Sequence, residues 1–273
     1  MQDAAKTLGE LLTAAGLRHE VERGARGWPL AHFAYEGPTG EGVLMTAELE
    51  GRIFRLTSYG HGKPQDPSLA RLDGLNRAWG FGRYTRSGAT GLVDATAAVL
   101  MGKPLPPELL TELVEHMADA GAALEQDRPP KLALSGDAGL YPEQVQAALA
   151  MLGVQAGRTA EGAVICRFKA GPARPPLLVE FFAEGGLELV VRARFPTEHT
   201  LAIDEAVRER VNGFNEDLDF GTLVFFDDPG FVAWVGTVLV PWAPVEPGML
   251  QELIERADVV MRGVAGLGSQ DPA

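Results

Sequence analysis

Apolar positions in the first half of the chain change from helical spacing to strand-like runs and back again. Leu8, Leu11 and Leu12 recur on one helical face, and Gly16 follows them as a helix stop. Apolar runs separated by turn residues then predict strands. In chain order we expect a helix ending near 16, strands over 30–35, 43–49 and 52–57, a helix over 68–79, and strands over 81–85 and 89–99. A last helix is opened by Pro104, Pro106 and Pro107 and extends to 124.

The second half repeats this order, α-β-β-β-α-β-β-α. Its expected elements are a helix over 142–152, strands over 163–169, 177–183 and 187–195, a helix over 202–215, strands over 221–226 and 231–240, and a helix over 249–264.

The two halves also share identical residues in register, which indicates a duplication. Near the final helices six identities are offset by 140: Pro104/Pro244, Pro107/Pro247, Leu110/Leu250, Glu112/Glu252, Leu113/Leu253 and Glu115/Glu255. Upstream, three identities are offset by 139: Asn76/Asn215, Phe81/Phe220 and Gly82/Gly221.

The repeat divides the chain into two α+β domains with antiparallel sheets and helices packed on one face of each. We expect domains over 1–128 and 138–265, a linker over 129–137 that is rich in helix and strand breakers, and a disordered tail over 266–273.

The last strands of the second copy are apolar on both faces, so both faces need cover. Helices of the same domain cover one face, and the first copy, a second subunit or a bound partner covers the other. The candidate partner or dimer interface is therefore Phe231, Trp234, Trp242, Phe226, Phe181 and Phe182, each of which is alternatively core.

The formal net charge of −13 restricts the class of partner. Residues 1–128 carry 13 Lys and Arg against 17 Asp and Glu, a net −4, and the remainder carries 11 against 20, a net −9. Phosphate binding needs clustered cations, so we expect no direct nucleic-acid binding. An acidic surface favours a basic or disordered segment of a partner, for example of a nucleic-acid-binding protein, although it also serves solubility alone.

The sequence contains neither a signal-peptide pattern nor an apolar run long enough to cross a bilayer, so we expect a cytoplasmic protein that does not bind membranes. The single cysteine, Cys166, excludes an intramolecular disulfide and is expected to be a small buried residue of a strand.

No motif for catalysis, cofactor binding or metal binding is found. No two histidines have the spacing of a helical metal pair, and His116 is expected on an exposed helix face. Asp217, Asp219, Asp227 and Asp228 form the densest acidic group, but they lack the spacing of a calcium-binding loop. We therefore expect no cofactor and no metal, while an enzyme without such a motif stays open, because catalytic groups come together in space rather than in sequence.

The element order resembles that of type III secretion chaperones and of YbjN-like bacterial proteins. The stretch from Leu75 and Asn76 to Trp79, Phe81 and Gly82 is similar to the YbjN-type helix end, as is a final helix that opens with proline. This resemblance implies the chaperone-like fold and a non-enzymatic role, in which acidic dimers hold an extended segment of a client protein. The tandem arrangement departs from the single-domain pattern of these families.

These observations predict a chaperone-like or regulatory module that binds another protein, and a homodimer is an open alternative. A second hypothesis is a small-molecule sensor or enzyme with a pocket between the two copies, and a third is a purely structural dimer module.

Overall fold

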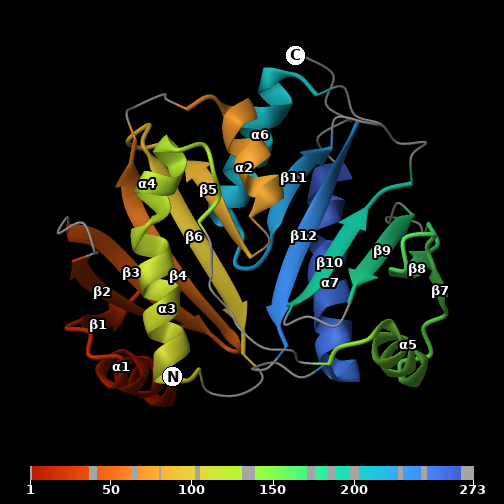
Figure 1. Cartoon of the computed structure of the whole chain (residues 1–273), viewed down its shortest axis with the longest axis horizontal. Coiled ribbons are helices and arrows are strands. Elements are labelled where there is room, and N and C mark those ends of the chain that lie inside the picture. The colour runs from red at the N-terminus through yellow and green to blue at the C-terminus, as the bar shows by residue number, and fades with distance from the viewer. Residues whose placement is uncertain are drawn as a thin grey trace. The chain divides into compact units, whose positions relative to one another are not determined.

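The computed structural model describes residues 2–36, 42–62, 67–79, 81–101, 105–130, 139–170, 176–183, 188–196, 203–226, 230–240 and 245–265. They form seven helices and two six-stranded antiparallel sheets. The chain separates into two compact units (Figure 1). The first unit comprises Met1–Leu134 together with Glu216–Phe220, and the second comprises Ser135–Asn215 and Gly221–Ala273. Most of the expected linker and the whole expected tail lie outside the described residues.

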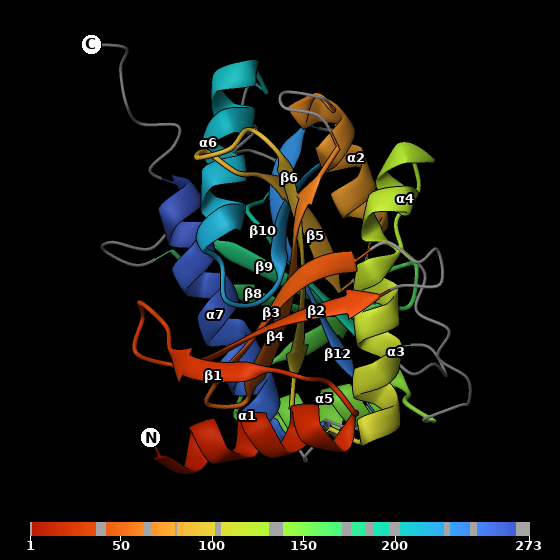
Figure 2. The same cartoon turned by 90° about the vertical axis from the view of Figure 1, so that its left-hand side faces the viewer.

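The sheet of the first unit has the strand order β1-β2-β3-β4-β6-β5. Helices α1, α3 and α4 pack on one face, and α2 packs against β5. Figure 2 shows α1 running across the lower end of α3. The elements are α1 (Gln2–Ala14), β1 (Glu20–Arg23), β2 (Pro29–Glu36), β3 (Gly42–Glu50), β4 (Ile53–His61), α2 (Leu69–Ala78), β5 (Gly82–Arg86), β6 (Val93–Leu100), α3 (Pro107–Ala118) and α4 (Ala120–Glu125).

The sheet of the second unit has the order β11-β12-β10-β9-β8-β7, which is the same topology read from the other edge. Helix α7 packs against β10 and β12, and α5 packs against β7, β8, β9 and α7. The elements are α5 (Pro142–Met151), β7 (Ala156–Arg158), β8 (Val164–Phe168), β9 (Leu177–Phe182), β10 (Glu188–Arg194), α6 (Glu205–Asp217), β11 (Thr222–Phe226), β12 (Phe231–Leu239) and α7 (Pro247–Ala265).

The predicted element order omits one strand in each copy. Strand β1 and its counterpart β7 each form one edge of their sheet. All four residues of β1 are exposed, and β7 is only three residues long with a central glycine. Such edge strands carry no buried apolar alternation, and short, charged edges protect a sheet from pairing with other chains. The predicted last helix of the first copy is also divided at Asp119 into α3 and α4.

Two asparagines of the repeat hold the end of a helix to the neighbouring strand. The Asn76 side chain donates from Nδ2 to the carbonyl of Tyr84 at 2.9 Å and accepts from its amide at 2.6 Å. Asn215 makes the same pair of bonds to Leu223, at 2.9 Å and 2.7 Å. Both asparagines are buried, so each one satisfies backbone groups that would otherwise lack partners. This paired bonding explains why the sequence repeat keeps asparagine at this point.

In each copy a tryptophan ring packs against the glycine at the start of the strand that follows the asparagine-held helix. A Cβ atom on Gly82 would lie 2.2 Å from the ring of Trp79, and one on Gly221 would lie 2.5 Å from the ring of Trp234. Both rings are buried, and glycine is required at both positions because of this close approach. Trp79 ends a helix whereas Trp234 lies in β12. Each copy therefore places a tryptophan against its own glycine, but from a different element.

None of the described helices combines the length and the apolar character that are needed to cross a bilayer.

Candidate functional site

The aromatic residues predicted as an interface divide between two faces of the second sheet. Trp234 and Phe181 have no exposed surface and belong to the core on the face that the helices cover. Trp242 lies outside the described residues. Alternation along the strands places Phe182, Phe226 and Phe231 on the opposite face, where each is half-buried.

The three phenylalanines on that opposite face are covered by arginines. Phe226 and Phe231 stack with their ring centroids 4.7 Å apart. The guanidinium of Arg192 lies 4.8 Å from the centroid of Phe182 and 5.5 Å from that of Phe226, and Arg194 lies 5.2 Å from that of Phe231. These cation–π contacts make the cluster a set of mutually satisfied side chains.

Glu180 anchors both arginines of this cluster. Its carboxylate accepts from Nε of Arg192 at 2.8 Å and from Nε of Arg194 at 3.3 Å, and Glu180 is buried. A buried carboxylate needs such partners, so the ion pairs explain why an acidic residue is tolerated in the middle of β9.

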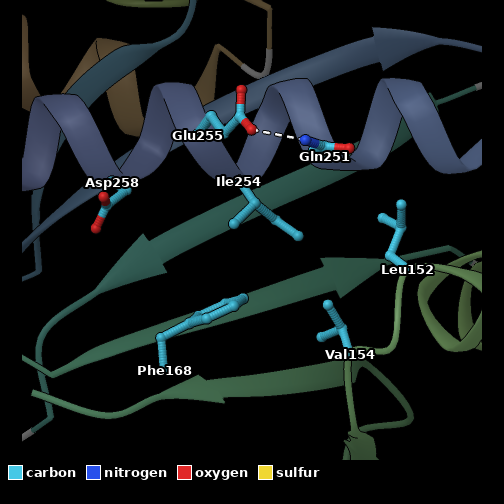
Figure 3. Close-up of a pocket in the computed structure, with 7 residues that line it drawn as sticks. All are labelled: Leu152, Val154, Phe168, Gln251, Ile254, Glu255 and Asp258. Atoms are coloured by element: carbon cyan, nitrogen blue, oxygen red, sulfur yellow. Dashed lines mark hydrogen bonds between the residues drawn. The ribbon is translucent and has the colours of Figure 1, made fainter.

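A groove of about 320 Å³ lies in the second unit between α7, the end of α5 and strand β8 (Figure 3). Figure 3 shows apolar side chains from both walls pointing into it and polar side chains on the α7 wall. The lining residues are Leu152, Val154, Phe168, Gln251, Ile254, Glu255 and Asp258.

The end of α5 positions one apolar wall of this groove. Gly153 adopts a positive φ of 72°, and its amide donates to the carbonyl of Ala150 at 2.9 Å. The amide of Val154 then donates to the carbonyl of Leu149 at 3.0 Å, which closes the helix end. This turn places Leu152 and Val154 on either side of Gly153, facing α7.

The polar side of the groove carries two carboxylates. The Glu255 side chain is exposed and accepts a hydrogen bond from Nε2 of Gln251 at 2.8 Å. Asp258 forms an ion pair with Arg262 at 2.9 Å. Neither lysine nor arginine is among the described residues that line the groove, so its rim is acidic above an apolar floor.

In the first copy, a hydrogen bond between a tyrosine and a glutamate lies at the position that corresponds to the groove. Tyr84 and Leu223, the residues that the two asparagines bind, are equivalent in the two copies. Following the strand pairing from them across each sheet makes Tyr35 the counterpart of Phe168. The repeat makes Glu115 the counterpart of Glu255. The Tyr35 hydroxyl donates to Glu115 Oε1 at 3.4 Å. Burial, and then the Glu115 carboxylate, raise the pKa of Tyr35. Phe168 has no hydroxyl, so the second copy cannot form this bond.

A buried serine–histidine pair in the first unit lacks the arrangement of an activated nucleophile. Ser58 Oγ lies 2.8 Å from Nε2 of His61 and 3.1 Å from the carbonyl of Met117. A carbonyl only accepts, so the hydroxyl donates to Met117 and accepts from His61 Nε2. The histidine therefore cannot take the serine proton as a general base would. Burial lowers the pKa of His61 to about 4 and keeps the ring neutral.

The expectation that His116 lies on an exposed helix face is wrong. His116 is buried, and its Nε2 accepts a hydrogen bond from Trp79 Nε1 at 3.2 Å. The ring of Phe81 stacks on it with a centroid separation of 5.0 Å. A neutral imidazole packs well between two aromatic rings, and helical spacing alone could not reveal those partners.

Asp217 and Asp219 of the predicted acidic group belong to the first unit and are held by arginines of that unit. Arg26 pairs with Asp219, and it donates to the carbonyl of Asp217 at 3.1 Å. Arg55 also pairs with Asp219, at 3.1 Å, and the buried Arg83 donates to the Leu218 carbonyl. Asp227 and Asp228 lie outside the described residues.

Burial, and then repulsion from Arg55, lower the pKa of Arg83 to about 9.

Among the described residues, no group of three or more His, Cys, Asp or Glu side chains is placed to hold a metal ion. Cys166 is buried, as expected, and burial raises the pKa of its thiol to about 11, so it is not an activated nucleophile.

The sequence pattern does not predict the groove, because its lining comes from three separated segments. A usable signal was nevertheless present at Glu115 and Glu255, since an identical acidic residue was already aligned by the repeat. Comparison of the chain with protein-family models, with curated proteins and with solved structures finds no match in any of the three.

Proposed function

We propose that this protein is a non-catalytic protein-binding module that holds a segment of a partner protein in the groove between α7 and β8. The observation that carries the proposal is the combination of an apolar floor with an acidic rim in the second unit. Side chains of a partner, inserted between a helix and a sheet, would bury the floor while polar groups at the rim orient the segment.

The size of the groove favours a short peptide segment. A volume of about 320 Å³ lies at the lower end of the ~300–1,000 Å³ that is typical of small-molecule sites, and it suits one or two large apolar side chains. Apolar surface also continues beyond the groove. Met151, next to Leu152, is 78% exposed, and Val259, one helical turn beyond Glu255, is 63% exposed.

The proposal includes the type III secretion chaperone-like fold in tandem, and a client-holding role follows from that resemblance. The two sheets with helices on one face and the repeated helix end at Asn76 and Asn215 support it. One fold hosts many functions, and function depends on a site, so the groove is the feature to test.

The test compares partner capture by the full chain and by groove variants. Tagged wild-type protein, Phe168→Ser and Val154→Ser are incubated with nuclease-treated lysate from the source cells, and bound proteins are identified by mass spectrometry. We expect one stoichiometric protein with wild type and a loss of more than tenfold with both variants. Far-ultraviolet circular dichroism and the melting temperature show whether the variants remain folded.

The matched control is Tyr35→Ser, which changes the equivalent position of the first copy and should leave capture unchanged. If Phe168→Ser unfolds, the exposed rim variant Gln251→Lys replaces it. Equal capture by wild type and by all folded groove variants would refute the groove as the binding site.

A further inference from the structure

We infer that the groove of the second copy selects a partner segment in which a large apolar residue lies beside a lysine or arginine. This inference rests on the proposed function and adds the chemistry of the partner. It is carried by the charges at the rim and by the difference between the two copies.

The rim offers a carboxylate that no cation in the described part of the chain neutralises. Among the described residues, Glu255 accepts a hydrogen bond from Gln251 but forms no ion pair. Its neighbour at the rim, Asp258, is paired with Arg262. The second half of the chain carries most of the negative charge of the protein, so the local and the long-range potentials both favour a cationic group.

The first copy shows how the same glutamate is occupied when the groove position is closed. Glu115 receives the hydroxyl of Tyr35. In the second copy Phe168 stands at that position, and Glu255 loses the corresponding donor. A lysine or arginine of a bound segment would supply a donor to Glu255 and a positive charge at once.

The apolar floor requires the second element of the motif. Phe168 and Ile254 face one another across the groove, and Val154 lies beside them (Figure 3). From Gln251 to Asp258 the helix rises by about 10 Å, which an extended chain of three to four residues spans. The apolar anchor and the cation should therefore lie within about three residues of each other.

The experiment uses a phage-displayed library of random 12-residue peptides, selected on the immobilised full chain. Enriched peptides are synthesised, and their affinities are measured by fluorescence anisotropy. We expect them to carry Phe, Leu, Ile or Met within three residues of Lys or Arg. Glu255→Gln should weaken the best peptide about five- to tenfold, and Phe168→Tyr should weaken it similarly because the new hydroxyl can reach Glu255.

The matched controls are Glu115→Gln and Tyr35→Phe in the first copy, which should change the affinity by less than twofold. Raising the salt concentration should reduce the effect of Glu255→Gln, because the pair lies at an exposed rim.

Two different failures are distinguishable. Peptides that lose binding with Phe168→Ser but lack basic residues and ignore Glu255→Gln would overturn the inferred selectivity and leave the binding function standing. If no enriched peptide depends on Phe168 or Val154, the groove is not a peptide site and both proposals fall.

Discussion

The same glutamate has a different neighbour in each copy of the domain. Glu115 is reached by the hydroxyl of Tyr35, whereas Glu255 lines an apolar groove together with Phe168. The underlying scaffold is shared, because strand order and the asparagine bonds agree between the copies. The two copies therefore keep the same framework and differ on one exposed face, and the proposed function lies on that face.

The largest expected effect on stability is at the buried tryptophan, which comes from a helix end in the first copy and from β12 in the second. Trp234→Ala should lower the free energy of unfolding by about 3–5 kcal/mol, because a fully buried aromatic ring is replaced by a cavity. Hydrogen exchange of residues 222–239 in the intact chain would report this loss locally.

Phe231→Ala provides the control for Trp234, since Phe231 is half-buried on the opposite face of the sheet. It should cost clearly less. Equal costs for the two substitutions would contradict the division of these aromatics between core and face.

Lowering the pH from 6.5 to 4 should reduce the free energy of unfolding of the first copy by about 3 kcal/mol through His61. The pKa of His61 is lowered from 6.5 to about 4 in the folded first unit. Between these values the unfolded chain binds a proton that the folded chain does not, so stability falls as the pH decreases from 6.5 to 4.

Denaturant unfolding of wild type and His61→Gln across this pH range measures the histidine contribution by difference. Wild type should lose more stability than the variant as the pH falls, with hydrogen exchange locating the loss in the first unit. Parallel pH profiles for the two proteins would show that His61 is not kept neutral by burial.

The asparagine bonds should be equally important in both copies. Asn76→Ala and Asn215→Ala should each cost about 2 kcal/mol, because each substitution leaves a buried amide and carbonyl without their partners. Glu209→Ala on the exposed side of α6 is the matched control and should change stability by less than about 0.5 kcal/mol. Markedly unequal costs would mean that the two bonds are not equivalent.

The smallest stability effects are expected where the copies differ most in proposed function. Tyr35→Phe removes one long hydrogen bond at an exposed site and should cost less than about 1 kcal/mol. Phe168→Tyr should be similarly mild, so a large change in its melting temperature would contradict the open groove at this position.

Much of the fold could be predicted from the sequence. The alternation of helical and strand-like patterns, with the repeat, gave the elements and the duplication. Strands β1 and β7 escaped because exposed edge strands bury no side chain that could create a pattern. The split between Phe231 and Trp234, and between Phe181 and Phe182, follows from strand alternation, so the sequence already contained that signal.

The groove could not be predicted in the same way. Its floor joins Val154, Phe168 and Ile254, and only the packing of α7 on the sheet brings these residues together. The buried His116 is a similar case, because its aromatic partners come from the segment after α2.

The tryptophan packed on a glycine in each unit also gives each copy its own optical probe. Trp79 and Trp234 are both buried, and each belongs to a different unit. With Trp28 and Trp242 replaced by phenylalanine, a further substitution of either remaining indole leaves a single fluorophore. Its emission should shift to longer wavelength when its own copy opens, so the unfolding of the two duplicates can be followed separately in one chain. The indole of Trp79, which donates to His116, should in addition respond in intensity to any change at that imidazole.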